Sequence, residues 1–246
     1  MLHPMEARLY VVHGSHPSAC VEKALALKGI EYRRVELLPP VHAAIQRVRF
    51  GGRTVPGIRL DGEKVQGSRA ILRRLDELRP DPPLYPSDAE ARARVEEAER
   101  WGDEVLQQVA RRLSWQVIKR RPAVMASYAR GSRFAMPDSL AALAARAMVP
   151  AELRLHHITD DALVTDLAEL PGHVERVDGW IGEGVLGGAE PNAADLQIAP
   201  SVRLLMTIGD VRPLIEGHPA EQLALRLFPD WAGDAPAGIL PQPVPA

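Results

Sequence analysis

One short segment near the start of the chain, HGSHPSAC at residues 13–20, gathers side chains that could do chemistry: two serines, two histidines and the only cysteine. Ser15 leaves an apolar, strand-like run and enters a helix-like run. Its hydroxyl and the free N–H groups of the first helical turn would therefore face a bound anion. A hydrogen bond to a charged acceptor contributes about 1.5–3 kcal/mol, which lowers the pKa of a bound thiol by about one to two units. The alternative role for Ser15 is a plain helix cap.

The other polar residues of this segment point to different roles. Ser15 and Ser18 occupy the two positions of a C-x-x-C redox motif, so disulfide exchange through that motif is excluded. A free cysteine inside a helix, as expected for Cys20, is usually a small buried apolar residue, and a redox role would need an exposed thiol of low pKa. His16 adjoins Ser15, an arrangement that seldom gives nucleophile–base geometry, and the chain has no G-x-S-x-G elbow. A hydrolase triad is therefore not expected.

Alternating strand and helix patterns predict a small mixed sheet with helices over the first 80 residues. Asp61-Gly62 joins two short apolar runs and is a strong hairpin signal. Gly29 is expected to end the first helix, and Ser68 to cap the third. The expected order is β-α-β-(α)-β-β-α, with strands at 8–12, 32–37, 57–60 and 63–66 and helices at 21–28, 42–49 and from 68 onward.

The composition then changes, which predicts a second domain. The segment RPDPPLYPSD at residues 79–88 holds four prolines and is typical of a linker. The predicted domains are residues 1–80, a linker at 81–88, and an all-helical domain at 89–246 with an extended tail. Two capping boxes are expected at helix starts, Ser87 with Glu90 and Asn192 with Asp195. Two apolar helix faces are expected as well: one with Leu140, Leu143, Ala144 and Ala147, the other with Leu163, Leu167 and Leu170.

Composition limits the function classes. The chain has 246 residues, of which 46% are hydrophobic and 25% charged, and a formal net charge of -2. No nucleic-acid or membrane partner is therefore expected. A single cysteine excludes an internal disulfide framework and a cysteine-rich zinc site, and His156-His157 has no matching ligand set, so no metal is expected. Met1 to Ala7 is polar, without a signal-peptide pattern, so the expected compartment is the cytoplasm.

Three motifs in this order and spacing resemble those of the soluble glutathione transferases. SHPSACVEKALALKGIEY is similar to the first-helix signature of the serine-type classes, theta and zeta. TVPGIRLDGEKVQGSRAI is similar to the family's "VP-strand-DG-strand-S-x-A-I" segment. EPNAADLQIAP is similar to the capping motif of the core helix in the second domain. The resemblance covers the first domain densely and the second domain in outline.

The resemblance implies a thioredoxin-like, thiol-binding fold for residues 1–80 and roles for particular residues. Ser15 is the expected catalytic residue. The Val55–Pro56 peptide is expected to be cis and to offer the Val55 backbone to the cysteinyl part of a bound tripeptide. The sequence departs from the family at Gly67, where a glutamate or glutamine normally precedes the serine, so the thiol could be glutathione or another low-molecular-weight thiol. The glutathione-binding residues implied are Arg53, Thr54, Val55, Pro56, Gln66, Gly67 and Ser68.

The helical domain supplies the expected electrophile pocket. Arg111 and Trp115 are four residues apart on one helix face, and the resemblance implies that this helix lines the pocket. The alternative is a core tryptophan beside a solvated arginine. The family usually forms two-fold dimers, so a homodimer is expected by resemblance.

Three functions remain open at this stage. The first is a glutathione transferase that activates a bound thiol for attack on a small electrophile, with conjugation, isomerase and lyase chemistry all available. The second is a non-catalytic binding or interaction protein of the same fold. The third is a redox protein that uses Cys20.

Overall fold

The computed structural model describes residues 6–241, so the prediction for the first residues, Met1 to Ala7, lies largely outside the described part. The first half of the chain alternates strands and helices in the predicted order, with the hairpin at Asp61-Gly62. Its elements are β1 (Ala7–Val12), α1 (His16–Leu27), β2 (Arg33–Leu37), α2 (Val41–Phe50), β3 (Gly57–Leu60), β4 (Glu63–Gln66) and α3 (Ser68–Leu78). Gly29, at a φ of 59°, follows the end of α1 as expected.

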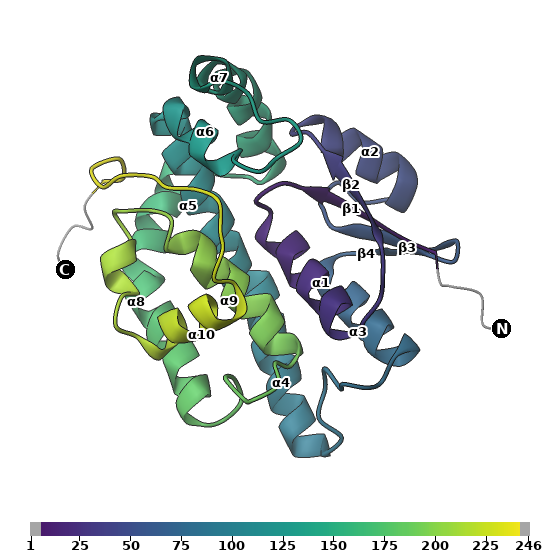
Figure 1. Cartoon of the computed structure of the whole chain (residues 1–246). Helices are drawn as coiled ribbons and strands as arrows, with labels where there is room; N and C mark the ends of the chain where they lie inside the picture. The colour runs from purple at the N-terminus through teal and green to yellow at the C-terminus, as the bar shows by residue number, and fades with distance from the viewer. Residues whose placement is uncertain (1–5, 242–246) are drawn as a thin grey trace.

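The four strands form one mixed sheet in the order β2-β1-β3-β4. β1 pairs in parallel with β2 and antiparallel with β3, and β3 pairs antiparallel with β4. Helices α1 and α3 cover one face of the sheet, and α2 lies on the other (Figure 1). Strand residues such as Leu9 and Ile58, and helix residues such as Leu25 and Ile71, are fully buried and form the core between these layers.

The second half of the chain is helical, as predicted, and packs against α1 and α3 (Figure 1). Its elements are α4 (Ala89–Trp101), a π-helical turn (Gly102–Leu106), α5 (Gln107–Arg120), α6 (Met125–Tyr128), α7 (Asp138–Leu155), α8 (Asp160–Gly182), α9 (Ala193–Leu205) and α10 (Pro219–Leu227). Helix α9 lies at the centre, and nearly all of its residues are buried. Asn192 and Asp195 form the predicted capping box at its start.

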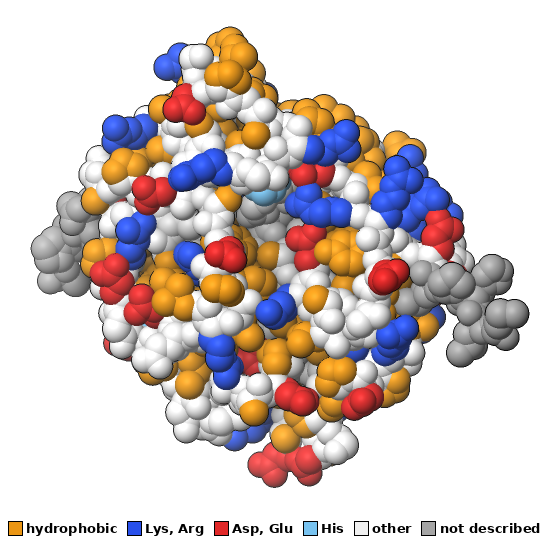
Figure 2. Space-filling view, in the orientation of Figure 1, with side chains coloured by type: hydrophobic (Ala, Val, Ile, Leu, Met, Phe, Trp, Pro, Cys, Tyr) orange, Lys and Arg blue, Asp and Glu red, His pale blue; other side chains and the backbone are white. Residues whose placement is uncertain are grey.

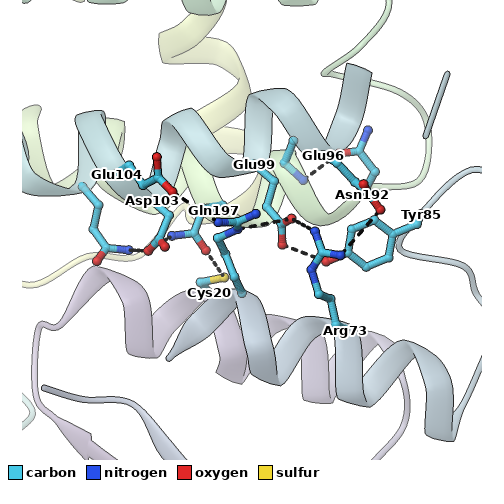
Figure 3. Close-up of polar contacts among 12 residues, drawn as sticks. Cys20, Arg73, Tyr85, Glu96, Glu99, Asp103, Glu104, Asn192 and Gln197 are labelled. Carbon is cyan, nitrogen blue, oxygen red and sulfur yellow. Dashed lines mark hydrogen bonds and ion pairs between the residues drawn. The ribbon is translucent and has the colours of Figure 1, made fainter. Parts of the chain in front are cut away.

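A buried row of polar side chains joins the two halves (Figure 3). Glu99 of α4 is fully buried, accepts a hydrogen bond of 2.7 Å from the Tyr85 hydroxyl and lies 3.2 Å from Nη2 of Arg73 on α3. Burial raises the pKa of the Glu99 carboxyl, while Tyr85 and Arg73 oppose that rise. Cys20 donates from its Sγ to Oε1 of Gln197 at 3.5 Å in the same row. These contacts fix the orientation of α1, and therefore of Ser15, against the helical half.

Two details of the helical half differ from the sequence predictions. Helix α4 is capped by Asp88, whose Oδ1 accepts from the Ala91 N–H at 2.8 Å, so the expected capping role of Ser87 is wrong. The expected stripe on α7 is also wrong: Leu140 and Leu143 are 52% and 61% exposed. The face that α7 turns inward instead carries Ala141, Ala145, Val149 and Glu152. Because apolar residues occur on two adjacent faces of α7, their periodicity does not decide which face is buried. The buried Glu152 makes the inner face look more polar than it is expected to be.

The stripe predicted on α8 is confirmed, since Leu163, Leu167 and Leu170 are buried. The tail after α10 lies over the helical half: Leu240 is buried, and the Asp210 carboxylate accepts from the backbone N–H groups of 238–240. Among the described residues, no helix is long and apolar enough to cross a membrane.

Candidate functional site

A cavity lies where the first half of the chain meets α5 and α7, and Figure 2 shows a hollow at this junction with histidine atoms inside it. The loop after β1, the end of β2 and the cis-proline loop form one wall. Trp115, Tyr128 and Met148 belong to the opposite, largely apolar wall. A second, more polar cavity adjoins it and contains Gly67 and Ser68. Thr54, Val55 and Arg111 line both cavities, so the two form one continuous site.

Ser15 stands at the N-terminus of α1 and lines the first cavity. Its Oγ accepts hydrogen bonds from the Ser18 hydroxyl at 3.0 Å and from the Ser18 N–H at 3.4 Å. Within the described residues, its own hydroxyl proton is donated to no partner. Ser15 is therefore the helix cap and also a polarised donor, because the two hydrogen bonds it accepts make its proton more acidic.

Two other side chains of the HGSHPSAC segment that could be reactive, His16 and Cys20, are buried. His16 is buried, and its Nε2–H donates to the Gln107 carbonyl at 3.1 Å. Burial, with the positive charge of Arg111, lowers the pKa of His16 well below its usual value, so the ring is neutral. Cys20 is fully buried, and burial with Glu99 and Asp103 nearby raises its thiol pKa. The conditions for a redox role of Cys20 are not met.

The cis-proline loop has the geometry that the sequence predicted. The Val55–Pro56 peptide is cis. Among the described residues, the Val55 N–H and C=O have no hydrogen-bond partner, although Val55 lines both cavities. Gln66 supports this loop from β4: its Oε1 accepts from the Gly52 N–H at 2.8 Å, and its Nε2 donates to the Thr54 carbonyl at 2.9 Å.

The predicted thiol-binding residues therefore separate into two groups. Thr54, Val55, Gly67 and Ser68 line the site. Arg53, Pro56 and Gln66 do not belong to either cavity lining: Arg53 is exposed, Pro56 is buried, and Gln66 holds the loop from behind. The sequence placed these three near the site because they are close along the chain to residues that do line it.

Gly67 shows why the expected acidic or amide residue is replaced. Its φ is 89° and its ψ is 140°, a backbone conformation that side-chain-bearing residues adopt only under strain. A Cβ at this position would meet nothing within 4 Å, so the constraint is the backbone and not space. Gly67 is also the residue that precedes α3, so the expected capping role of Ser68 is wrong: Ser68 is the buried first residue of the helix.

Arg111 carries a positive charge at the junction of the two cavities. Its guanidinium donates to Oε1 of Gln108 at 2.6 Å and to Oε1 of Gln107 at 2.9 Å, and no described carboxylate lies within ion-pair distance. Burial lowers its pKa to about 10, so it stays charged at neutral pH. A partly buried cation whose only partners are neutral amides can bind an anionic group of a ligand. Trp115, four residues on, lines the first cavity beside it, as predicted.

Sequence reasoning missed the polar residues that complete this site. Gln107 and Gln108 orient Arg111 from the preceding turn of α5. Glu152 and His156 of α7 line the first cavity one helical turn apart. Gln107 and Arg111, like Glu152 and His156, are four residues apart, a spacing that predicts a contact on one helix face and could have identified them. The described residues contain no cluster of histidine, cysteine or acidic side chains that could hold a metal ion.

Two hydrogen bonds beside the first cavity tie its walls together. The Nε2–H of His13 donates to the Arg130 carbonyl at 2.8 Å. The Ser132 hydroxyl donates to the Glu36 carboxylate. Both bonds join the first half of the chain to the segment between α6 and α7, so that segment forms a roof over the cavity.

Comparison with known proteins places this geometry in a family. Residues 9–83 match the family model described as "Glutathione S-transferase, N-terminal domain". A maleylacetoacetate isomerase of Rattus norvegicus is 36% identical over 107 residues, which are 37% of this chain and 46% of that protein. One of Drosophila melanogaster is 35% identical over 96 residues, which are 35% of this chain and 39% of that protein. The matching segment thus spans about half the length of these curated relatives or less.

Solved structures show the fold over nearly the whole chain. A glutathione S-transferase of Sinorhizobium meliloti 1021 superposes with a TM-score of 0.60 at 16% identity, covering 96% of both chains. One from Rhodospirillum rubrum F11 gives a TM-score of 0.57 at 20% identity, again covering 96% of both. The protein has the fold of solved glutathione S-transferases, and its residues 9–83 match the model of their N-terminal domain.

Proposed function

We propose that the protein is a glutathione-dependent enzyme that activates the bound thiol for attack on a small, acidic electrophile. The observation that carries the proposal is the pair of adjoining cavities that meet at Val55 and Arg111, with Ser15 in the wall of the first. The polar cavity suits the peptide, and the apolar cavity suits the electrophile.

Each group of the site has a task in this reaction. Ser15 donates its free hydroxyl proton to the thiolate sulfur and stabilises the anion. The unpaired backbone groups of Val55 accept the cysteinyl backbone as an added strand. The N-terminus of α3, with Ser68 as its first residue, faces the second cavity and favours a carboxylate of the peptide. Gly67 brings no side chain to this contact.

Arg111 and the apolar wall select the electrophile. The guanidinium binds a carboxylate of the substrate, while Trp115, Met148 and Tyr128 cover its carbon skeleton. An α,β-unsaturated acid combines these features with a carbon that a thiolate attacks. Addition gives a conjugate. Addition, rotation about the former double bond and elimination give an isomer instead, and the similarity to maleylacetoacetate isomerases favours this second outcome.

The experiment that tests the proposal is glutathione-dependent turnover of unsaturated dicarboxylic and keto acids by purified protein. We expect conversion by the wild type, conversion reduced about 10- to 30-fold at pH 6.5 but retained glutathione binding in Ser15→Ala, and full activity in Cys20→Ser. Unchanged turnover at pH 6.5 in Ser15→Ala, or loss in a folded Cys20→Ser, contradicts the proposed mechanism.

A non-catalytic role is the second candidate, and Gly67 is the observation that favours it, because the family's side-chain contact is missing there. In that case no electrophile is converted and Ser15→Ala changes nothing. A two-fold homodimer and a cytoplasmic location stay predictions; light scattering that gives the mass of one chain would contradict the dimer.

A further inference from the structure

Three ionisable side chains from two helices form a cluster on the wall of the first cavity. His42 comes from the first turn of α2, Glu152 from the last turn of α7, and His156 directly follows α7. All three line the cavity that Ser15 also lines. The Glu152 carboxylate lies between the rings: Oε1 is 3.7 Å from Nδ1 of His42, and Oε2 is 3.4 Å from Nε2 of His156.

The cluster is buried but not satisfied. Glu152 is 1% exposed and His42 is 4% exposed. Both facing atoms, Oε1 of Glu152 and Nδ1 of His42, are buried without a hydrogen-bond partner among the described residues. Buried polar groups in native proteins nearly always have partners, so a pair that lacks them at a cavity wall calls for an explanation, and a catalytic role supplies one. His42 lines the cavity, and its Nε2 makes no hydrogen bond to another described residue.

The proposed reaction needs a group of this kind. Glutathione enters as a thiol, and its proton must leave before the sulfur can attack. Ser15 cannot take it, because its hydroxyl already accepts two hydrogen bonds and acts as a donor. A histidine whose second nitrogen faces a carboxylate is the usual side chain for this proton transfer, since the carboxylate fixes the tautomer and stabilises the imidazolium.

We infer that His42, oriented by Glu152, is the acid–base group that takes the thiol proton and later returns it. This inference rests on the proposed function. A short closure of the 3.7 Å gap lets Nδ1–H of His42 donate to Oε1 of Glu152, and Nε2 then presents a lone pair to the cavity. The proton reaches Nε2 directly or through one water.

The step balances without another reactant. The S–H bond breaks, its electron pair stays on sulfur, and the proton moves to His42. The thiolate forms a C–S bond to the unsaturated acid, and the double-bond pair moves toward the carbonyl. In an addition, the imidazolium returns the proton to the α-carbon. In an isomerisation, the C–S bond breaks, the double bond re-forms and the proton returns to sulfur.

The charges around His42 suit a base. Burial lowers the pKa of His42, and so do His156 and Arg111, whereas the Glu152 carboxylate opposes them. The ring is therefore neutral near pH 7 and able to accept a proton. Formation of a thiolate in the same cavity favours the imidazolium, because a nearby opposite charge raises the pKa of a histidine.

The test needs no electrophile. Glutathione is added to the protein at neutral pH in a weak buffer, thiolate is measured by its ultraviolet absorbance, and released protons are measured with a pH indicator. Wild type is compared with His42→Gln and with Glu152→Gln. His173→Gln is the matched control, because His173 lies 3.8 Å from Glu169 on the same helix but outside the cavity. Circular dichroism and thermal unfolding check that each variant is folded.

We expect the wild type and His173→Gln to form thiolate with little proton release, because His42 keeps the proton. In His42→Gln the thiolate fraction falls, or each thiolate releases one proton to the bulk. Glu152→Gln shifts both readouts in the same direction and carries the test if His42→Gln does not fold. Equal thiolate and one released proton per thiolate in all variants overturns the inference and leaves the proposed function intact. Absence of thiolate in the wild type overturns both.

Discussion

In the proposed reaction the Ser15 hydroxyl lowers the pKa of the bound thiol, and the effect of its removal can be calculated. Ser15→Ala removes a side-chain donor at the start of α1 whose proton has no partner among the described residues. It also removes the cap of α1, while the cis-proline loop keeps its own contacts. A hydrogen bond to a charged acceptor contributes about 1.5–3 kcal/mol. At about 1.4 kcal/mol per unit, the variant should raise the pKa of bound glutathione by about one to two units.

The shift translates into a pH-dependent loss of activity. If Ser15 lowers a thiol pKa from about 8.5 to about 7, roughly a quarter of the thiol is ionised at pH 6.5, compared with roughly 1% in the variant. Turnover at pH 6.5 should therefore fall about 10- to 30-fold, and the loss should shrink to less than about twofold near pH 9, where both forms are mostly ionised.

The assay is a pH titration of the thiolate absorbance of bound glutathione, with the free peptide as reference. Ser18→Ala is the matched control, because the Ser18 hydroxyl donates to Ser15 Oγ at 3.0 Å and only polarises it. We expect a shift in the same direction but smaller than that of Ser15→Ala. Equal thiol pKa values in wild type and Ser15→Ala, or a larger shift in Ser18→Ala, would refute the role assigned to Ser15.

Three further predictions concern stability. Burial lowers the pKa of His16 and of His42 in the folded chain, so below about pH 6.5 the unfolded chain binds protons that the folded chain does not. As the pH is lowered below that value, the free energy of unfolding should fall by up to about 1.4 kcal/mol per pH unit for each ring. In urea titrations at several pH values His16→Asn should weaken this pH dependence, and an unchanged dependence would contradict the prediction. Gly67→Gln should cost about 1–3 kcal/mol because it forces a side chain into a φ of 89°, seen as a lower urea midpoint; an unchanged midpoint would mean that the backbone is not strained. Leu143→Lys should change the free energy of unfolding by less than about 0.5 kcal/mol, whereas Leu170→Ala should lower it by about 2–5 kcal/mol. Similar losses for the two variants in thermal unfolding would contradict the placement of Leu143 on the exposed face of α7 and of Leu170 on the buried face of α8.

Local sequence signals were sufficient for the first domain. Asp61-Gly62 can form only a tight turn between two short strands, and β3 and β4 have the predicted limits. The cis peptide before Pro56 and the capping box of Asn192 with Asp195 are likewise confirmed. In each case the decisive residues are neighbours along the chain, so their pattern carries the structure.

The helical half shows the limit of the same reasoning. On α7 the periodicity selected Leu140 and Leu143, which are exposed, because small residues such as Ala145 form the buried face. Hydrophobicity alone ranks leucine above alanine, but close packing of α7 against α5 favours small side chains. Tertiary packing therefore overrode the pattern.

The site was predicted in part. Ser15, Val55 and Arg111 line the cavity as expected, because motif and helix spacing placed them. His42 and Glu152 were not identified, since they are more than one hundred residues apart in the sequence and meet only through the packing of α2 and α7 around the cavity. No local pattern reports a contact of that kind.

The most direct test of the central claim is a calorimetric titration of glutathione into the purified protein. The account predicts binding at one site per chain, in the micromolar to low-millimolar range, with affinity retained in Ser15→Ala. No heat at several millimolar glutathione would contradict the claim that these cavities hold this thiol.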